Sequence, residues 1–392
     1  MFEQGSEAGL RVALVLGTSA GGVGRHVHSV AAGLTARGAH VVVLGPPETE
    51  ELFGFTGTGA RFAPVEISDR PRPARDAHAV ARLRRLLRGT PGDAARGSGG
   101  AEVVHAHGLR AGGLAVAALA GIVPGPLRFS RGRPPLVVTL HNAVIAGGVT
   151  AVAYGALERI VARGAAAVLG VSPDLEDRMR ALGAREVGRA LVPAPPPTRS
   201  PGPAERAEMR AELGIGDRPL ILTVGRLAHQ KGLPTLLDAA AGWTARTSPP
   251  LVAIVGDGPL ENELRGRIET EGLPVRLLGR RQDVPALLAA ADVVVVPSVW
   301  EGQPLVVQEA LRAGRPLIAT RVGGIPDLVE DAALLVPPGD AGALRDAVAQ
   351  VLDDSALAVR LGAAAVRRAA ALPTEDAAVQ QLLTLYQELV IR

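Results

Sequence analysis

The sequence predicts an α/β protein with two doubly wound domains, each built on a parallel sheet. Short β-branched runs alternate with stretches rich in Ala and Leu along the 392 residues of the chain. Near-continuous apolar strands joined by crossover helices are typical of parallel sheets that helices cover on both faces. The alternation runs twice, and a proline-rich stretch at residues 192–203 lies between the two series. This organisation predicts two domains.

Eleven strands are expected, five before the proline-rich stretch and six after it. Each candidate precedes a glycine-rich turn and then a run of helix formers, as in successive βα units. The first five are residues 11–16, 40–44, 102–105, 136–140 and 166–170, and the other six are residues 220–224, 251–255, 275–278, 293–296, 317–319 and 333–336.

Three other segments are assigned by their composition. Residues 77–88 predict an amphipathic, arginine-rich helix, which either packs its leucines inward or contacts anionic lipid. Residues 90–100 and 122–135 are rich in Gly, Pro and Arg, and they are expected to be loops.

Prolines cannot continue a helix, so the proline-rich stretch is expected to be a stiff connector. We therefore place an N-terminal, Rossmann-like domain at residues 1–197 and a second, Rossmann-like domain at residues 198–373. Residues 374–392 contain a helical pattern that is expected to cross back to the first domain.

The composition excludes several classes of protein. The chain has no cysteine, which rules out disulfides, thiolate metal sites and a cysteine nucleophile. It shows no basic segment followed by an apolar one at its start, and its longest apolar runs are too short to span a bilayer. We expect a soluble, cytoplasmic protein without a nucleic-acid partner.

The charge is unevenly distributed along the chain. Residues 1–200 contain 23 arginines and 15 acidic residues, a net charge of +8, whereas the remainder carries −5. A basic first half fits an anionic acceptor or peripheral contact with the inner face of a membrane. It also fits a solvated surface without a partner.

The only lysine of the chain, Lys231, lies in a loop at residues 225–232. This loop follows the strand at 220–224 and leads into an expected helix. Loose backbone amides at a helix start, together with Arg226 and the compact ammonium of Lys231, favour phosphate binding. A surface lysine without a function is the alternative.

Two glutamates follow the strand at residues 293–296. Glu301 lies in the loop at the carboxyl edge of the sheet, where ligands bind in open α/β folds. Pro304 suits the first position of a helix, which places Glu309 on its second turn. A carboxylate can accept two hydrogen bonds from a vicinal diol such as ribose. The carboxylate of the other glutamate can orient sugar hydroxyls or balance the positive charge of an oxocarbenium-like transition state.

These segments resemble glycosyltransferase family 4, which has the GT-B fold of two facing Rossmann-like domains. The similarity is carried by the loop at 225–232, the Gly-Asp-Gly-Pro turn at 256–259, the segment at 301–309 and a glycine pair at 323–324. The family transfers a sugar from a nucleotide-diphosphate donor with retention of configuration and without a metal. The resemblance implies the same activity here, with an unknown glycan, lipid or small molecule of the cell envelope as acceptor.

The resemblance also implies roles for individual residues. Arg226 and Lys231 would hold the donor diphosphate and act in catalysis by stabilising its charge as the glycosidic bond breaks. Glu309 would bind the ribose. Glu301 would face the donor sugar and act in catalysis. The backbone of Gly302, Pro304 and Leu305 would face the donor sugar and the distal phosphate. Gly279 would lie in a stretch that borders the nucleobase, and Asp257 would also belong to the donor site.

The first domain has a glycine-rich loop at residues 17–24 and three histidines at strand ends. The glycines of this loop do not have the spacing Gly-x-Gly-x-x-Gly, and no acidic residue ends the next strand. Both observations argue against binding of a nicotinamide cofactor. By the resemblance, Gly22 faces the donor phosphates and His141 lies beside the donor sugar and takes part in catalysis. His107 and Asn142 are placed on the acceptor side. Each histidine could instead simply cap a strand end.

No cofactor or metal site is expected. His105 and His107 could form a metal pair, but the sequence shows no third ligand near them. Two alternatives to a glycosyltransferase stay open, namely another GT-B enzyme such as a sugar epimerase or a phosphorylase, and a non-catalytic nucleotide- or sugar-binding protein.

Overall fold

The computed structural model describes residues 9–19, 21–88, 100–120, 133–143, 148–197, 199 and 201–392. The expected loops at 90–100 and 122–135 lie almost wholly outside this part of the chain. Contacts divide the protein into two compact units, one of Met1–Pro193 with Pro373–Arg392 and one of Ala194–Leu372. The division precedes the expected boundary after residue 197, because the Ala194 amide donates to Gln308 Oε1 (2.8 Å) and its carbonyl accepts from Arg312.

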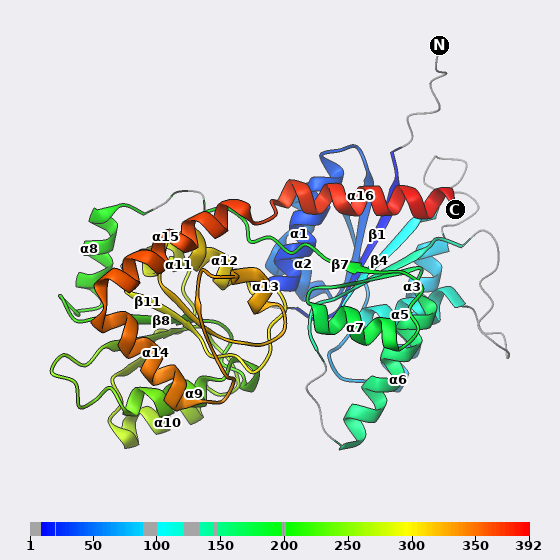
Figure 1. Cartoon of the computed structure of the whole chain (residues 1–392). Helices are drawn as coiled ribbons and strands as arrows, with labels where there is room; N and C mark the ends of the chain where they lie inside the picture. Colours follow the sequence, from blue (N-terminus) through cyan, green and yellow to red (C-terminus); the bar gives the residue numbers. More distant parts are fainter. Residues whose placement is uncertain are drawn as a thin grey trace, which may run out of the picture. The chain divides into compact units, whose positions relative to one another are not determined.

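The first unit is built on a seven-stranded parallel sheet with the order β3-β2-β1-β4-β5-β6-β7. Figure 1 shows helices on both faces of this sheet. The strands are β1 (Arg11–Leu16), β2 (His40–Gly45), β3 (Arg61–Pro64), β4 (Val103–His107), β5 (Leu136–Leu140), β6 (Ala167–Gly170) and β7 (Val187–Arg189). The helices are α1 (Gly22–Thr35), α2 (Pro47–Phe53), α3 (Pro73–Arg88), α5 (Leu109–Ala120), α6 (Gly148–Gly164) and α7 (Pro173–Ala181), with a 3₁₀ turn, η1 (Phe55–Thr58).

The last helix of the chain, α16 (Glu375–Ile391), packs against α1 of the first unit (Figure 1). Thr374 caps it by accepting a hydrogen bond from the Ala377 amide (3.1 Å). Gly33 of α1 leaves room for Val379, because a Cβ at Gly33 would come within 2.4 Å of that side chain. Tyr386 is fully buried. These contacts make α16 an integral part of the first unit.

The second unit is built on a six-stranded parallel sheet with the order β10-β9-β8-β11-β12-β13. Its strands are β8 (Leu220–Val224), β9 (Leu251–Val255), β10 (Val275–Leu277), β11 (Val293–Val296), β12 (Leu317–Thr320) and β13 (Leu334–Val336). Its helices are α8 (Pro203–Glu212), α9 (Leu233–Ala241), α10 (Glu261–Glu271), α11 (Val284–Ala290), α12 (Leu305–Arg312), α13 (Ile325–Val329), α14 (Ala341–Asp353) and α15 (Ser355–Ala371), with a 3₁₀ turn, η2 (His229–Lys231).

Side chains that alternate along these strands form two separate cores. Leu220 and Leu222 belong to one buried cluster, whereas Ile221 between them belongs to the other. Successive strand residues face opposite sides of a sheet, so each cluster fills the space between one face and its helices. This arrangement holds the strand ends rigidly at one edge.

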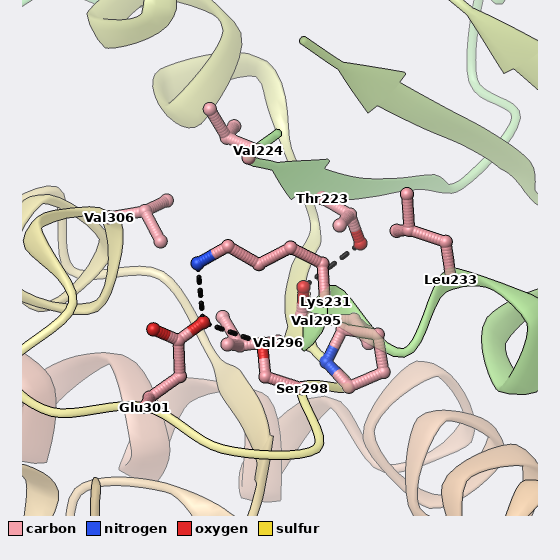
Figure 2. Close-up of a pocket in the computed structure, with 11 residues that line it drawn as sticks. Thr223, Val224, Lys231, Leu233, Val295, Val296, Ser298, Glu301 and Val306 are labelled. Carbon is pink, nitrogen blue, oxygen red and sulfur yellow. Dashed lines mark hydrogen bonds and ion pairs between the residues drawn. The ribbon is translucent and has the colours of Figure 1, made fainter. Parts of the chain in front are cut away.

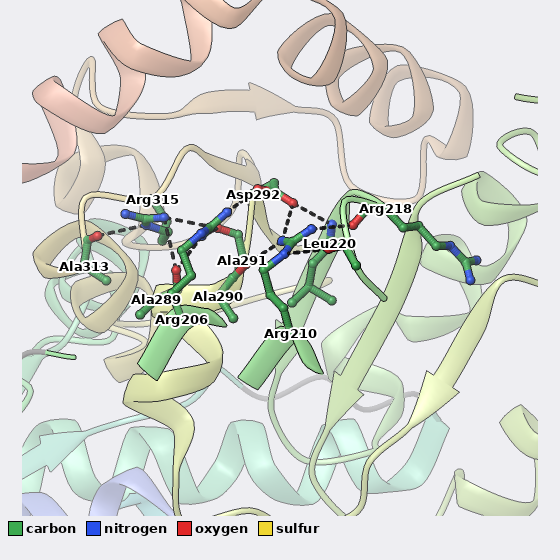
Figure 3. A network of polar contacts seen from close by, with 11 residues as sticks. Arg206, Arg210, Arg218, Leu220, Ala289, Ala290, Ala291, Asp292, Ala313 and Arg315 are labelled. Atoms are coloured by element: carbon green, nitrogen blue, oxygen red, sulfur yellow. Dashed lines mark hydrogen bonds and ion pairs between the residues drawn. The ribbon is translucent and has the colours of Figure 1, made fainter. Parts of the chain in front are cut away.

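An arginine network stabilises the amino-terminal edge of the second sheet (Figure 3). Asp292 accepts hydrogen bonds from Arg206 (2.7 Å), Arg210 (3.0 Å) and the Leu220 amide (2.8 Å). Arg206 and Arg315 also donate to the carbonyls of Ala289 and Ala291. The network satisfies carbonyls at the end of α11 that would otherwise lack donors.

The predicted two-domain α/β fold is confirmed. Each of the eleven predicted strands is present, with ends that differ by up to two residues. The sequence analysis missed the edge strands β3 and β7, which are short and only partly buried. It also placed Pro304 inside α12, whereas Pro304 has an extended ψ of 126° and caps a helix that begins at Leu305.

Candidate functional site

The second sheet changes its winding direction between β8 and β11, which are neighbours in the sheet but not in sequence. β8 is followed by η2, which ends at Lys231, and β11 is followed by the loop that contains Glu301. Loops that leave adjacent parallel strands at such a switch point diverge and open a crevice at the carboxyl edge. The two residues singled out from the sequence therefore lie at the usual ligand-binding position of this fold.

Lys231 and Glu301 form an ion pair in this crevice, with Nζ 2.5 Å from Oε1 (Figure 2). Ser298 Oγ donates to the same carboxylate oxygen at 2.7 Å, and the Thr320 hydroxyl donates to the Ser298 carbonyl at 2.5 Å. Glu301 is 5% exposed. A buried carboxylate needs such partners to remain charged, so the pair fixes both functional groups in place.

A small pocket adjoins the ion pair. Figure 2 shows the Lys231 side chain extended across it, with Val224 and Val306 on the side opposite Glu301. Apolar walls lower the local dielectric and strengthen electrostatic interactions with a bound group. The Lys231 ammonium carries three donors and its side chain is 25% exposed. It can therefore keep Glu301 and still donate to an anion.

Two glycines allow the loops to approach one another around the pair. Gly232 has φ +62°, and a Cβ there would lie 1.9 Å from the Pro297 carbonyl oxygen. Gly323 has φ +51°, and its Cβ would lie 1.9 Å from the Glu301 carbonyl oxygen, which also accepts the Gly324 amide at 3.0 Å. Only glycine tolerates both a left-handed φ and so close an approach of another backbone atom. The glycine pair at residues 323–324, after β12, therefore positions the backbone of Glu301.

The Gly-Asp-Gly-Pro turn at residues 256–259 supports the loop at residues 225–232 through its backbone. The Asp257 carbonyl accepts the Leu227 amide (2.8 Å), and the Gly279 carbonyl accepts the Gly256 amide (2.8 Å). The Asp257 side chain is exposed. These contacts link the loops after β8, β9 and β10 into one surface.

The other predicted donor-site residues lie in the loops and helix starts of the same unit and differ in exposure. Arg226 is exposed in the loop after β8, and Glu309 is half-buried on α12. Gly302, Pro304 and Leu305 are buried where α12 begins. The structure brings Lys231 and Glu301 into direct contact and supplies Ser298 and Thr320, which the sequence analysis did not single out. A polar residue two positions after a buried strand was the available signal for Ser298.

The first unit contains a cluster of histidines at the carboxyl edge of its sheet. His107 ends β4, His141 follows β5, and the two rings are joined by a hydrogen bond between His107 Nδ1 and His141 Nε2 (3.2 Å). His26 of α1 lies against both, with ring centroids 5.6 Å from His107 and 5.5 Å from His141. The sequence analysis missed His26, because nothing in the sequence shows which helix residue meets a strand end.

His105 completes the cluster and is tied to α16. Its Nδ1 is 2.5 Å from the Tyr386 hydroxyl, and its Nε2 is 2.7 Å from Thr139 Oγ1. Burial lowers the pKa of His105 to about 3, with a smaller effect from His26. The imidazole is therefore neutral at pH 7.

The remaining predicted residues of the first unit lie near this edge. Gly22 is the first residue of α1, and the glycine-rich loop before it is described except for residue 20. Asn142 is exposed next to His141. In the part of the chain that the structure describes, no helix has the length and apolar character needed to cross a membrane.

Each of the two units matches a family model of glycosyltransferases. The family model described as "Glycosyl transferase 4-like domain" matches residues 21–195, and "Glycosyl transferases group 1" matches residues 205–368. The chain is 35% identical over 242 residues to an alpha-D-kanosaminyltransferase of Streptomyces kanamyceticus, covering 59% of this chain and 63% of the relative.

A second relative is a 2-deoxystreptamine N-acetyl-D-glucosaminyltransferase of Streptomyces fradiae. It is 30% identical over 286 residues, which are 68% of this chain and 66% of the relative. The matches thus span slightly under two thirds of the length of these curated relatives. The structure of Anabaena Alr3699/HepE in complex with UDP and glucose superposes with a TM-score of 0.78 at 20% identity, covering 97% of this chain and 100% of that one. Since the two family models cover both units and the fold agrees, the chain belongs to the GT-B glycosyltransferases of the GT4 type.

Proposed function

We propose that the protein is a retaining, metal-independent glycosyltransferase that moves a sugar from a nucleoside-diphosphate sugar to an acceptor. The observation that carries this proposal is the Lys231–Glu301 pair at the switch point of the second sheet. A cation and a carboxylate in one crevice suit a donor that carries both phosphates and sugar hydroxyls.

The second unit would bind the donor. Lys231 and Arg226 would hold the diphosphate, and the first backbone amides of α12 would face it as further donors. As the glycosidic bond breaks, negative charge accumulates on the leaving diphosphate. Fixed cations and dipoles at that position stabilise the transition state more than the ground state.

The carboxylates would bind the two sugars of the donor. Glu301 would face the transferred sugar, since its free oxygen can accept hydroxyl protons while the other is held by Lys231 and Ser298. Glu309 would accept the ribose hydroxyls, and the loop with Gly279 would border the base. The described residues of this crevice include no activated nucleophile. This supports a mechanism in which the acceptor attacks the anomeric carbon on the same face that the diphosphate leaves.

The first unit would bind the acceptor. His107 and Asn142 would face it, and His141 would hold a sugar hydroxyl as a neutral imidazole, because burial lowers its pKa well below the usual value. The relatives are named for several different classes of acceptor. A cell-envelope glycan, a lipid and a small molecule such as an aminocyclitol are the candidates, and the basic first half favours an anionic one.

A donor screen followed by product analysis tests this function. We expect one nucleoside-diphosphate sugar to raise the melting temperature most, because a ligand of the native state stabilises it. With that donor and a panel of acceptors, the product should keep the anomeric configuration of the donor in its NMR couplings, and EDTA should leave the rate unchanged.

Four results would contradict the proposal. An inverted product or a rate that depends on added Mg²⁺ would overturn the retaining, metal-independent mechanism. Formation of an epimerised donor without transfer, or consumption of inorganic phosphate, would identify an epimerase or a phosphorylase.

A further inference from the structure

The histidine cluster of the first unit has the geometry of a metal site. His26 comes from α1, His107 from the end of β4 and His141 from the residue after β5. One ring nitrogen of each lies within 4.8 Å of those of the other two. Three imidazoles from three separate elements therefore surround one point.

The protonation state of these rings suits a cation. Burial lowers the pKa of His26 to about 4 and lowers the pKa of His107 and His141 well below the usual value. Neutral imidazole is the form that coordinates a metal, and a cluster without positive charge does not repel one.

His107 also has unused bonding capacity, in contrast to its neighbour on the same strand. Both ring nitrogens of His105 have partners, Tyr386 and Thr139. His107 is 2% exposed, and its Nε2 has no hydrogen-bond partner among the described residues. A buried polar atom without a partner is rare in a native protein, so His105 is a structural residue and His107 is available to a ligand.

We propose that His26, His107 and His141 form a binding site for a divalent transition-metal ion of the zinc class. Each residue contributes one ring nitrogen, and the fourth tetrahedral position stays open. Bond lengths of 2.0–2.1 Å place two nitrogens on a tetrahedral zinc ion roughly 3.4 Å apart. Ring movements of about 1 Å close the site to that spacing. Imidazole ligands select zinc, copper or nickel over magnesium and calcium.

The site goes beyond the proposed transfer reaction, which needs no metal. An ion held by His107 and His141 would compete with the acceptor and the sugar hydroxyl that the proposed function assigns to these two residues, so its consequence is structural and not catalytic. A bound ion would tie α1 to the carboxyl ends of β4 and β5. Zinc should therefore raise the melting temperature of the protein, since it binds the folded form.

Metal titration of the full chain without a histidine tag tests the site. Calorimetry should show one Zn²⁺ per chain, and Co²⁺ should produce the visible absorption of a four-coordinate ion. His26→Gln should weaken Zn²⁺ binding at least tenfold and abolish the Co²⁺ spectrum. The matched control is His78→Gln, which changes an exposed histidine on α3 and should bind as the wild type does.

The result that overturns the site is wild-type protein without a Co²⁺ spectrum or a Zn²⁺ stabilisation. Equal Zn²⁺ binding by wild type and His26→Gln would overturn it as well. Circular dichroism without metal shows whether His26→Gln folds, and His141→Gln replaces it in the same titrations if it does not. All readouts are of binding, so their failure leaves the proposed sugar transfer untouched.

Discussion

At the scale of single residues, the position of Glu301 depends on the close approach of Gly323 to its backbone. Gly323→Ala should lower the free energy of unfolding by more than about 1 kcal/mol, because the left-handed φ and the clash with the Glu301 carbonyl add. It should also reduce transfer at least tenfold by moving Glu301. Gly339→Ala is the matched control, since Gly339 has φ +76° with no atom within 4 Å of the added Cβ. Equal losses in urea unfolding and activity for both variants would show that the close approach is irrelevant.

The limits of prediction from sequence are visible at the same scale. Lys231 and Glu301 could be chosen because each follows a recognisable strand in an unusual local sequence. The direct contact between Lys231 and Glu301 could not be predicted from the sequence, because it depends on β8 and β11 being neighbours across the switch point. His26 lies in an ordinary helical pattern, and only the packing of α1 on the strand ends brings it to His107.

At the scale of elements, α16 is held to the first sheet by a buried polar contact. Tyr386→Phe removes the hydroxyl that meets His105 Nδ1 and leaves a buried nitrogen without a partner. We expect a loss of about 1–3 kcal/mol in urea unfolding. The chain has two tyrosines, and Tyr154→Phe removes an exposed hydrogen bond to the Asp69 carbonyl. A loss for Tyr386→Phe no larger than the control's would refute this role for α16.

Elements were predictable in proportion to their burial. β5, β8 and β11 lie inside their sheets and are almost wholly buried, with at most one polar residue each, so their ends agreed with the sequence. β3 and β7 are edge strands of four and three residues, and they contain Arg61, Pro64 and Arg189. These two edge strands bury little and contain few apolar residues, which leaves too weak a pattern to detect. The edge strands β10 and β13 of the second sheet are mostly Val and Leu, and they were predicted.

At the scale of the whole molecule, the two units differ in how much of the chain each requires. The second unit is continuous, Ala194–Leu372, and has both of its cores within that range. A fragment of residues 194–372 should therefore unfold cooperatively in urea. A fragment of residues 1–193 lacks α16 and would expose the face of α1 that contacts Val379, so it should not. Cooperative unfolding of the fragment of residues 1–193 would contradict the role given to α16.

The central claim is that the second unit holds a nucleoside diphosphate through the only lysine of the chain. Calorimetry of UDP, GDP and ADP with the wild type, Lys231→Ala and Arg360→Ala tests it most directly. Arg360 is an exposed cation of α15 in the same unit and serves as the control. The account predicts that the best-bound nucleotide loses at least tenfold in affinity with Lys231→Ala, about 1.4 kcal/mol, and nothing with Arg360→Ala. Equal affinity in all three proteins would contradict it.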